Sequence, residues 1–212
     1  TGMKVSEIGF GAWAIGGGWG PQDDSESLKA LHAAIDKGVT FIDTAAGYGD
    51  GRSERLIGKV LKERKEQLLV ATKTPPVQGY WPPSPYCEAE ERYPATYLRQ
   101  NVEERLKNLG VERIDVLQLH TWTRAWNRDA VPLHVLAKLK KEGKIRAIGV
   151  SRLADGWNDV SASSVSVTLP IFARLLRTKS RQWLSASRYN HVPIAASPLK
   201  LPSFRNACRK IS

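Results

Sequence analysis

Three short apolar runs each lead into a polar side chain that can take part in proton transfer, and this feature constrains the fold most. The runs and the residues that follow them are Val39–Ile42 with Asp43, Leu68–Thr72 with Lys73, and Ile114–Leu119 with His120. Each run has the length and residue types of a buried strand, and amphipathic helical sequence comes after it. Alternating strands and helices indicate a parallel α/β sheet. Because ligands gather at the C-terminal ends of such strands, we expect a site there that includes Tyr48 from the turn after Asp43.

Four segments have the spacing of amphipathic helices, and two more short runs complete the expected strands. The helices are predicted over Ser25–Lys37, Ser53–Leu61, Ala95–Leu109 and Val131–Lys141, and the strands over Lys4–Gly11 and Ala147–Val150. Ser25 is the predicted N-cap of the first helix, and Gly38 is its predicted C′ residue. The fifth strand ends at Ser151, so the strand ends recur at the spacing of βα units, with one longer interval.

Two loops at the expected rim differ from the rest of the chain in composition. The longer interval holds Thr74–Arg92, which is rich in Pro, Tyr and Trp. This segment could shape a substrate pocket, or it could only cover the edge of the sheet. Gly16–Gly20 is glycine-rich but has neither the Lys-Ser/Thr of a phosphate-binding loop nor a dinucleotide fingerprint. We interpret it as a flexible rim loop after the first strand.

The length of 212 residues predicts one domain, yet a complete (β/α)8 barrel usually needs about 250 residues. The chain opens with Thr1–Lys4, as if part-way through a first element, and no signal segment or membrane span is expected. Cys87 and Cys208 lie far apart and predict neither a disulfide framework nor a zinc site. A reducing, cytoplasmic location is therefore expected.

The net charge of +11 is concentrated in the last quarter of the chain. Residues 161–212 hold nine of the 32 Lys and Arg residues and none of the 21 Asp and Glu residues, so residues 1–160 are nearly balanced. The same segment has ten serines and no glycine. We divide the chain into a regular α/β portion, 1–160, and an atypical Ser/Arg-rich tail, 161–212, which is expected to be disordered. The leading hypothesis for the tail is translation out of frame. A basic tail for nucleic acid or anionic lipid is the alternative, and nucleic acid is not the expected partner.

Several motifs, in order and at consistent spacing, resemble those of the aldo-keto reductases. They are Phe41–Gly49 followed by Ser53–Gly58, Ala71–Lys73, Asp115–His120 and Gly143–Ser151. The resemblance covers about residues 2–160. It implies a (β/α)8 barrel, here incomplete with about five βα units before the atypical tail. It also implies an NADP(H)-dependent oxidoreductase that reduces aldehydes or ketones to alcohols, or oxidises a sugar or alcohol in reverse.

The resemblance also assigns roles to the four polar residues at the strand ends. Tyr48 would be the general acid that protonates the carbonyl oxygen, and Lys73 would make this tyrosine a stronger acid. Asp43 would keep Lys73 charged and oriented, and His120 would orient the substrate carbonyl. The chemistry agrees, because a free phenol titrates only near pH 10 and a buried lysine needs an anion nearby. Taken singly, each residue could instead be structural: a cap, a lid, a solvent-directed lysine or a core histidine.

Cofactor and substrate residues follow from the same resemblance. NADP(H) would contact Gly11, Ala12, Trp13, Asp43 and Ser151. The small carbonyl, sugar or alcohol substrate would contact His120 and Trp122, whereas core or loop packing is an equal alternative for Trp126. No group of residues has the spacing of metal ligands, so no metal is expected.

The chain departs from the family after the fifth strand, where the family carries most of its NADPH contacts. Arg152 follows Ser151 where the family often has Asn, and the similarity of Ala195–Leu199 to a family loop is interpreted as coincidental. Five parallel strands cannot close an eight-stranded barrel. The alternative functions are therefore a catalytically inactive barrel fragment or a non-catalytic binding module. A nucleic-acid binder acting through the tail is a third possibility.

Overall fold

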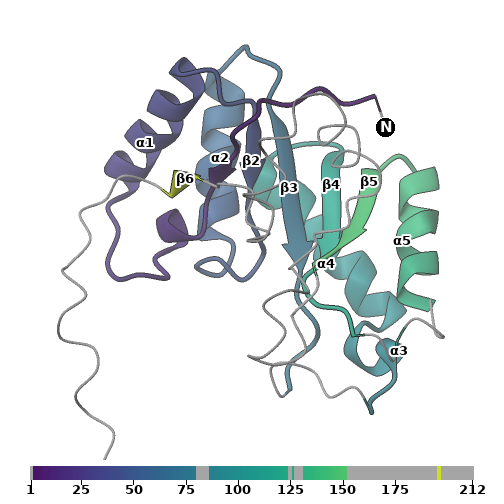
Figure 1. Ribbon diagram of the computed structural model, residues 1–212. Coiled ribbons are helices and arrows are strands. Elements are labelled where there is room, and N and C mark those ends of the chain that lie inside the picture. Colours follow the sequence, from purple (N-terminus) through teal and green to yellow (C-terminus); the bar gives the residue numbers. More distant parts are fainter. Residues whose placement is uncertain (1, 80–85, 124–125, 127–130, 152–194, 197–212) are drawn as a thin grey trace, which may run out of the picture.

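The computed structural model describes residues 2–79, 86–123, 126 and 131–151, together with the backbone of 195–196. Within these residues the chain forms one sheet of six strands in the order β5-β4-β3-β2-β1-β6, and every pair of neighbours is parallel. Figure 1 shows the strands side by side, with helices on the outside of the sheet. This is the arrangement of an incomplete (β/α)8 barrel, as the sequence predicted.

Strands and helices alternate along the chain from residue 10 to residue 150. The strands are β1 Phe10–Gly11, β2 Phe41–Asp43, β3 Leu69–Thr74, β4 Ile114–Leu119, β5 Ile145–Val150 and β6 Ala195–Ala196. The helices are the 3₁₀ turn η1 Ala14–Gly16, α1 Asp24–Asp36, α2 Arg52–Glu63, α3 Ala89–Arg92, α4 Ala95–Leu109 and α5 Val131–Lys141. The short one-turn helix α3 lies within the long loop between β3 and α4. The C-terminal ends of β2, β3, β4 and β5 therefore meet at one edge of the sheet, where the candidate residues lie.

The two faces of the sheet carry different side chains. One face packs against the helices, and its core includes Ile42, Val70 and Leu117 from the strands with Ile57 and Leu98 from α2 and α4. Each such side chain contributes roughly 1.5–3 kcal/mol by burial, so this layer holds the helices to the sheet. A second, smaller cluster is made of Ala71, Val116 and Ala147 from β3, β4 and β5, with Met3 and Phe41 packed against it.

The helix ends agree with the sequence prediction, apart from one cap. Gly38 and Gly110 follow α1 and α4 with φ of 89° and 66°, which is the left-handed conformation that favours glycine after a helix. The predicted N-cap Ser25 is wrong. Asp23 caps α1 instead, because its carboxylate accepts the N–H of Ser25 at 2.6 Å and of Glu26 at 3.2 Å. Ser25 is already the second residue of the helix, and its own N–H is one of the two that Asp23 caps.

The first predicted strand, Lys4–Gly11, is wrong over most of its length, since only Phe10 and Gly11 pair with β2. Ser6 and Thr40 exchange side-chain bonds instead: the Ser6 N–H donates to Thr40 Oγ1 at 2.8 Å, and the Thr40 N–H donates to Ser6 Oγ at 2.9 Å. These hydroxyls take the place of a main-chain ladder, so the chain meets β2 without forming a strand there.

The sheet contains one strand more than the five expected from the sequence. β6 pairs in parallel with β1, with Phe10 opposite Ala195 and Gly11 opposite Ala196. The pairing falls on the segment that the sequence analysis interpreted as a coincidental similarity. The remainder of the predicted tail lies outside the described residues, and the division at residue 160 stays a prediction.

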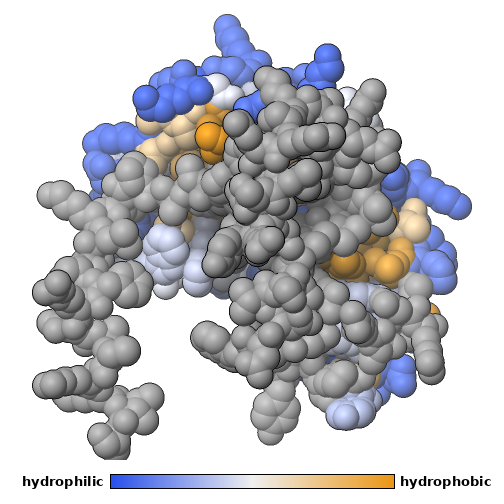
Figure 2. Space-filling view, viewed as in Figure 1, coloured by the Kyte–Doolittle hydropathy of each residue, from blue (hydrophilic) through white to orange (hydrophobic). Residues whose placement is uncertain are grey.

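The solvent side of the molecule is hydrophilic where the helices face outward. Figure 2 shows hydrophilic residues along the outer rim of the described part, over the helices. This is the polar face of amphipathic helices whose apolar face lies in the core. Among the described residues, no helix is both long enough and apolar enough to cross a bilayer.

Helices α2 and α4 approach each other closely at Gly58. A Cβ atom at this position would lie 2.7 Å from the carbonyl oxygen of Asn108 and 2.8 Å from that of Leu109. Backbone atoms cannot move aside as a flexible side chain can. The glycine therefore sets the distance between the two helices.

We predict that Gly58→Ala lowers the free energy of unfolding by about 1–3 kcal/mol, because the added methyl group forces the helices apart. Urea denaturation of the purified chain measures this. Gly47→Ala is the matched control, since a Cβ there meets nothing within 4 Å. A Gly58→Ala variant as stable as the parent would contradict the close packing.

Candidate active site

Four side chains converge at the C-terminal edge of the sheet, as the sequence predicted. Asp43 is the last residue of β2, Lys73 is the penultimate residue of β3, and His120 directly follows β4. Tyr48 lies in the turn between β2 and α2. Asp43 and Lys73 thus belong to their strands and do not follow them, so the strands fix their backbones directly.

Lys73 is buried, with 7% of its surface exposed, and its ammonium has two acceptors. Its Nζ donates to Asp43 Oδ2 at 2.7 Å and to the carbonyl oxygen of Thr44 at 2.9 Å. A buried ammonium is costly without an anion and further hydrogen bonds, and this site supplies both. Neighbouring strands hold the charge at a fixed point.

Tyr48 and His120 lie beside this ammonium. The Lys73 Nζ is 5.3 Å from the centre of the Tyr48 ring, which is within the range of a cation–π contact. The rings of Tyr48 and His120 meet edge-on with 5.9 Å between their centres. The phenol, the ammonium and the imidazole therefore form one cluster.

Glycines hold the turn that carries Tyr48 against the loop after β1. A Cβ at Gly16 would lie 2.6 Å from the Tyr48 carbonyl carbon, and one at Gly49 would lie 2.1 Å from the Gly16 oxygen. Gly49 also has a φ of 66°. The glycine-rich sequence of Gly16–Gly20 indicated only a rim loop, whereas Gly16 is buried in the structure and packs against the backbone of Tyr48.

His120 is held in the neutral form by its surroundings. Burial lowers the pKa of this imidazole from 6.5 to about 4, and the positive charge of Lys73 acts in the same direction. Its backbone N–H donates to the carbonyl oxygen of Thr74 at 2.8 Å, which ties the end of β4 to β3. At neutral pH the site therefore presents an uncharged imidazole beside a charged ammonium.

Of the residues predicted to bind a cofactor, Gly11 and Ser151 lie at strand ends, and Ala12 and Trp13 lie in the loop that follows β1. Gly11 lies beside Asp43 in the sheet register, and Ser151 follows β5, where its N–H donates to the Leu119 carbonyl oxygen at 2.8 Å. Ala12 is fully buried, whereas Trp13 is 51% exposed, with its ring 6.4 Å from that of Tyr48.

The structure buries Trp122, which the sequence analysis placed in the substrate site. Trp122 is 8% exposed and meets Trp126 edge-on, with 5.6 Å between ring centres. Trp126 is 2% exposed and also meets Tyr93 edge-on at 6.1 Å. Trp126 therefore has a packing role, and a substrate contact of Trp122 stays a prediction.

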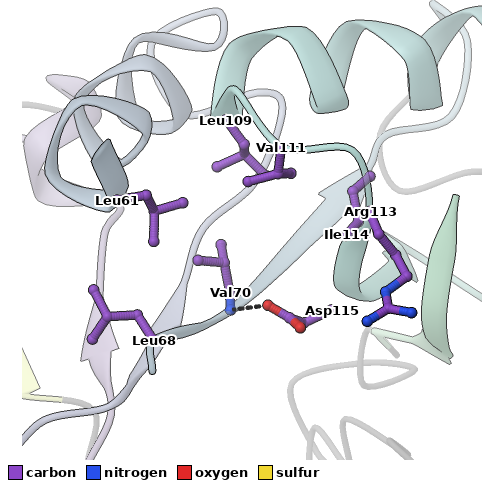
Figure 3. A pocket seen from close by; sticks show the side chains of 8 residues that line it. All are labelled: Leu61, Leu68, Val70, Leu109, Val111, Arg113, Ile114 and Asp115. Atoms are coloured by element: carbon purple, nitrogen blue, oxygen red, sulfur yellow. Dashed lines mark hydrogen bonds between the residues drawn. The ribbon is translucent and has the colours of Figure 1, made fainter. Parts of the chain in front are cut away.

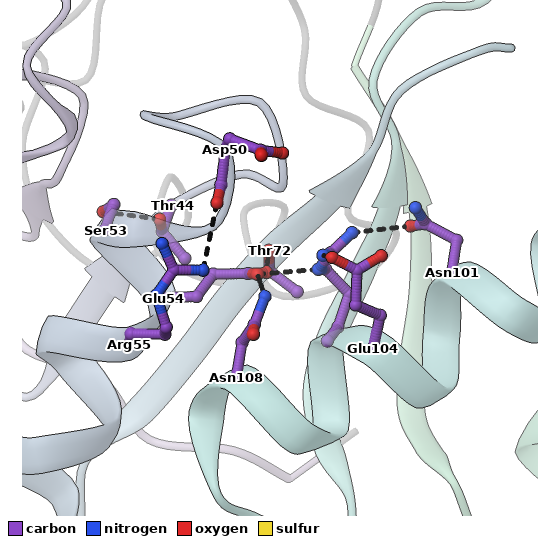
Figure 4. A network of polar contacts seen from close by, with 10 residues as sticks. Thr44, Asp50, Ser53, Glu54, Arg55, Thr72, Asn101, Glu104 and Asn108 are labelled. Atoms are coloured by element: carbon purple, nitrogen blue, oxygen red, sulfur yellow. Dashed lines mark hydrogen bonds and ion pairs between the residues drawn. The ribbon is translucent and has the colours of Figure 1, made fainter.

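A buried polar network behind the four converging side chains was missed from the sequence. Glu54 of α2 is fully buried, and its carboxylate accepts from Thr72 Oγ1 at 2.6 Å, Arg105 Nε at 2.6 Å and Asn108 Nδ2 at 3.0 Å (Figure 4). Burial raises the pKa of Glu54, and the charge of Arg105 opposes this. The signal was present in the motif Ser53–Gly58, which was noted for its resemblance and given no role.

The preceding residue, Ser53, connects the same helix to two strand ends. Its hydroxyl donates to the carbonyl oxygen of Ala12 at 2.9 Å and lies 2.8 Å from Thr44 Oγ1. Thr44 is the residue whose carbonyl oxygen accepts from Lys73. The first turn of α2 therefore braces the backbone around the ammonium.

A cavity lies at the opposite end of the strands. Its volume is about 210 Å³, and its lining includes Leu61 of α2, Leu68 just before β3, Val70 of β3 and Ile114 of β4 (Figure 3). Asp115 lies at its edge and accepts the Val70 N–H at 3.1 Å. The cavity shares no residue with the four converging side chains. In the described part of the chain, no group of three or more His, Cys, Asp or Glu residues could hold a metal ion.

The comparisons with known proteins agree on one family. The model of the Aldo/keto reductase family matches residues 7–200, a range that includes most of the predicted tail. Aldo-keto reductase YhdN of Bacillus subtilis is 40% identical over 161 residues, which cover 73% of this chain and 45% of that protein. The chain thus spans about half the length of the curated relatives it matches.

Solved structures give the same result. The glycerol dehydrogenase AKR11B4 from Gluconobacter oxydans has a TM-score of 0.58 and 34% identity, covering 73% of this chain and 47% of that one. An aldo-keto reductase from Klebsiella pneumoniae in complex with NADPH has a TM-score of 0.55 and 27% identity, covering 71% and 47%.

We predict that Arg105→Met costs about 3–5 kcal/mol of stability, because it leaves the buried Glu54 carboxylate without its charged partner. Arg99→Met on the same helix is the matched control. It breaks an exposed ion pair with Glu142, which water screens, and should cost much less stability than Arg105→Met. Denaturant unfolding compares the two, and equal losses would contradict the importance of the buried pair.

The lowered pKa of His120 predicts a pH dependence of stability. The unfolded chain binds the proton near pH 6.5 and the folded chain only near 4, so the free energy of unfolding falls as the pH falls through this window. Stability measured against pH should fall less steeply in His120→Gln. His134→Gln, which alters an exposed histidine of α5, should keep the slope of the parent.

Proposed function

The chain belongs to the aldo/keto reductase family of oxidoreductases, and from this premise we propose that it interconverts small carbonyl compounds and alcohols with a nicotinamide nucleotide. The observation that carries the proposal is the cluster at the strand ends. The Lys73 ammonium lies 2.7 Å from Asp43 and 5.3 Å from the ring centre of Tyr48, and His120 closes the cluster.

Tyr48 is the proposed general acid. Reduction places negative charge on the carbonyl oxygen, and the Tyr48 hydroxyl gives its proton to that oxygen as the alcohol forms. The Lys73 ammonium stabilises the phenolate that remains, and Asp43 fixes the position of the ammonium. In the oxidation direction the phenolate takes the proton back from the alcohol.

His120 is proposed to orient the substrate. Because its pKa is lowered to about 4, the imidazole is neutral at physiological pH. A neutral ring can donate one hydrogen bond to the substrate oxygen without adding a second positive charge beside Lys73. Two donors, Tyr48 and His120, would then bind one oxygen atom.

The nicotinamide ring is proposed to lie over the sheet at the level of Asp43 and Gln118. Their register neighbours are Gly11 and Gly149, which add no side chain there, and this supports the proposal. Asp43, Gly11, Trp13 and Ser151 are the proposed contacts in the described residues. The bound nucleotide supplies the hydride. The NADPH complex of the Klebsiella pneumoniae relative supports NADP(H), and NADH is the alternative to test.

A small polyol or sugar, or the corresponding carbonyl compound, is the proposed substrate class. The structural relative from Gluconobacter oxydans is a glycerol dehydrogenase. Trp13 is 51% exposed with its ring 6.4 Å from that of Tyr48, and Trp19, which is 54% exposed, meets Trp13 edge-on. Aromatic faces of this kind can pack against the C–H groups of a polyol. A cytoplasmic location is retained as part of the proposal.

We predict that Tyr48→Phe lowers the turnover of a carbonyl substrate by at least about 100-fold, because proton transfer is lost. NADPH or NADH affinity, followed by quenching of tryptophan fluorescence, should stay within about twofold. Tyr86→Phe, which alters a tyrosine that is 94% exposed, is the matched control and should turn over like the parent.

Measurements of nucleotide binding and turnover by the parent chain decide between this function and its alternative. Turnover with either nucleotide supports the oxidoreductase. Nucleotide binding and turnover both absent would favour the non-catalytic fragment. A Tyr48→Phe variant as active as the parent would contradict the role of the phenol.

A further inference from the structure

The segment that carries His120 leaves the sheet immediately after β4. The Leu119 carbonyl oxygen accepts from Ser151, and the His120 N–H donates to Thr74, so both residues are still tied to neighbouring strands. Thr121 is the first residue beyond these ties, and it is only 1% exposed. Its buried main-chain groups need partners from elsewhere in the fold.

One hydroxyl group supplies both partners. Tyr93 Oη donates to the Thr121 carbonyl oxygen at 3.1 Å and accepts the Thr121 N–H at 3.2 Å. A phenol can do both at once, since it has one hydrogen and free lone pairs. Tyr93 is itself fully buried. Burial raises its pKa, so the hydroxyl keeps its proton at neutral pH and can donate.

Tyr93 is held in turn by its own surroundings. It ends the short helix α3, and its N–H donates to the carbonyl oxygen of Ala89 at 2.9 Å. Its ring meets that of Trp126 edge-on, and the Trp126 indole N–H donates to the Cys87 carbonyl oxygen. The long loop between β3 and α4 thus presents a fixed hydroxyl to the backbone that follows His120.

We propose that Tyr93 is a positioning residue for His120: its hydroxyl fixes the backbone of Thr121 and thereby the place of the imidazole beside Tyr48 and Lys73. The catalytic part of this inference rests on the proposed function. Tyr93 lies behind Thr121 and acts only through it. From the sequence, the long loop could shape a substrate pocket or cover the edge of the sheet. With Tyr93 at its end, it has a third role, which is to support the site.

Removal of the hydroxyl alone tests the inference. Tyr93→Phe keeps the ring that packs on Trp126 and should lower kcat on the order of tenfold through misplacement of His120, with nucleotide affinity unchanged. Tyr97→Phe is the control for the loss of a tyrosine hydroxyl bond elsewhere, because the Tyr97 hydroxyl donates to the Pro75 carbonyl oxygen at 2.8 Å and not to the segment that follows His120. This control should keep kcat within about twofold of the parent. Equal losses in both variants, or none in Tyr93→Phe, would overturn the proposal.

A double-mutant cycle separates positioning from general loosening of the fold. If Tyr93 acts through His120, Tyr93→Phe should have no further effect on kcat in a His120→Asn background. A further loss of the same size as in the parent background would mean that Tyr93 acts elsewhere, and the proposal would fail.

The histidine signal in NMR gives a readout that needs no turnover. The His120 resonance, identified by its loss in His120→Asn, should titrate near 4 in the parent chain. In Tyr93→Phe it should move toward the ordinary value of 6.5, because the imidazole gains access to water while Lys73 is unchanged. An unchanged titration would overturn the positioning role. A parent chain without turnover would contradict the proposed function, and this titration would still decide the inference.

A second variant covers the case in which Tyr93→Phe does not fold. Replacement of Tyr93 by 4-aminophenylalanine keeps a polar donor at the same ring position and should hold kcat within about threefold. A tenfold loss in this folded variant would also count against the proposal.

Discussion

The ammonium of Lys73 is the constraint on which the rest of the site depends. A buried positive charge is tolerated only where an anion and further acceptors are fixed around it, and here they come from the end of β2. Asp43 supplies the anion and Thr44 supplies a carbonyl oxygen. Strand pairing holds these groups in place, so the charge has one position. Tyr48 and His120 are arranged around that position, and the neutral state of His120 is partly a response to the same charge.

Two further layers keep this arrangement rigid. Behind the sheet, Ser53 and Glu54 connect the first turn of α2 to Thr44, whose carbonyl oxygen accepts from Lys73, and to Thr72, which precedes Lys73. Beside the sheet, the hydroxyl of Tyr93 supports the backbone that follows His120. Each layer uses polar groups that are fully buried and fully paired, which raises the cost of displacing them. The site is thus held by hydrogen bonds as well as by packing.

The sequence predicted the features that depend on local periodicity and missed those that depend on distant partners. Helix α4 and strand β4 have the predicted bounds because their apolar spacing and the glycine after α4 are local signals. The cluster of four side chains was predicted because strand ends in a parallel sheet converge. The roles of Glu54 and Tyr93 were not, since nothing within a few residues of either shows that Arg105 or Thr121 lies beside it. The prediction of the first strand was wrong for the same reason, because Ser6 contacts Thr40 only in the folded chain.

The contact of backbone on backbone at Gly16 and Gly49 has a consequence for the evolution of the site. Any side chain at these positions would separate the two loops, so the glycines are closed to variation as long as Tyr48 must stay in place. Trp13 and Trp19, by contrast, are about half exposed to solvent on the loop after β1. Under the proposed function, substitution of these exposed tryptophans would alter the substrate contact and leave the backbone of Tyr48 in place, whereas substitution of the glycines would move Tyr48 itself. One short stretch of chain would then hold positions that tolerate change beside positions that do not.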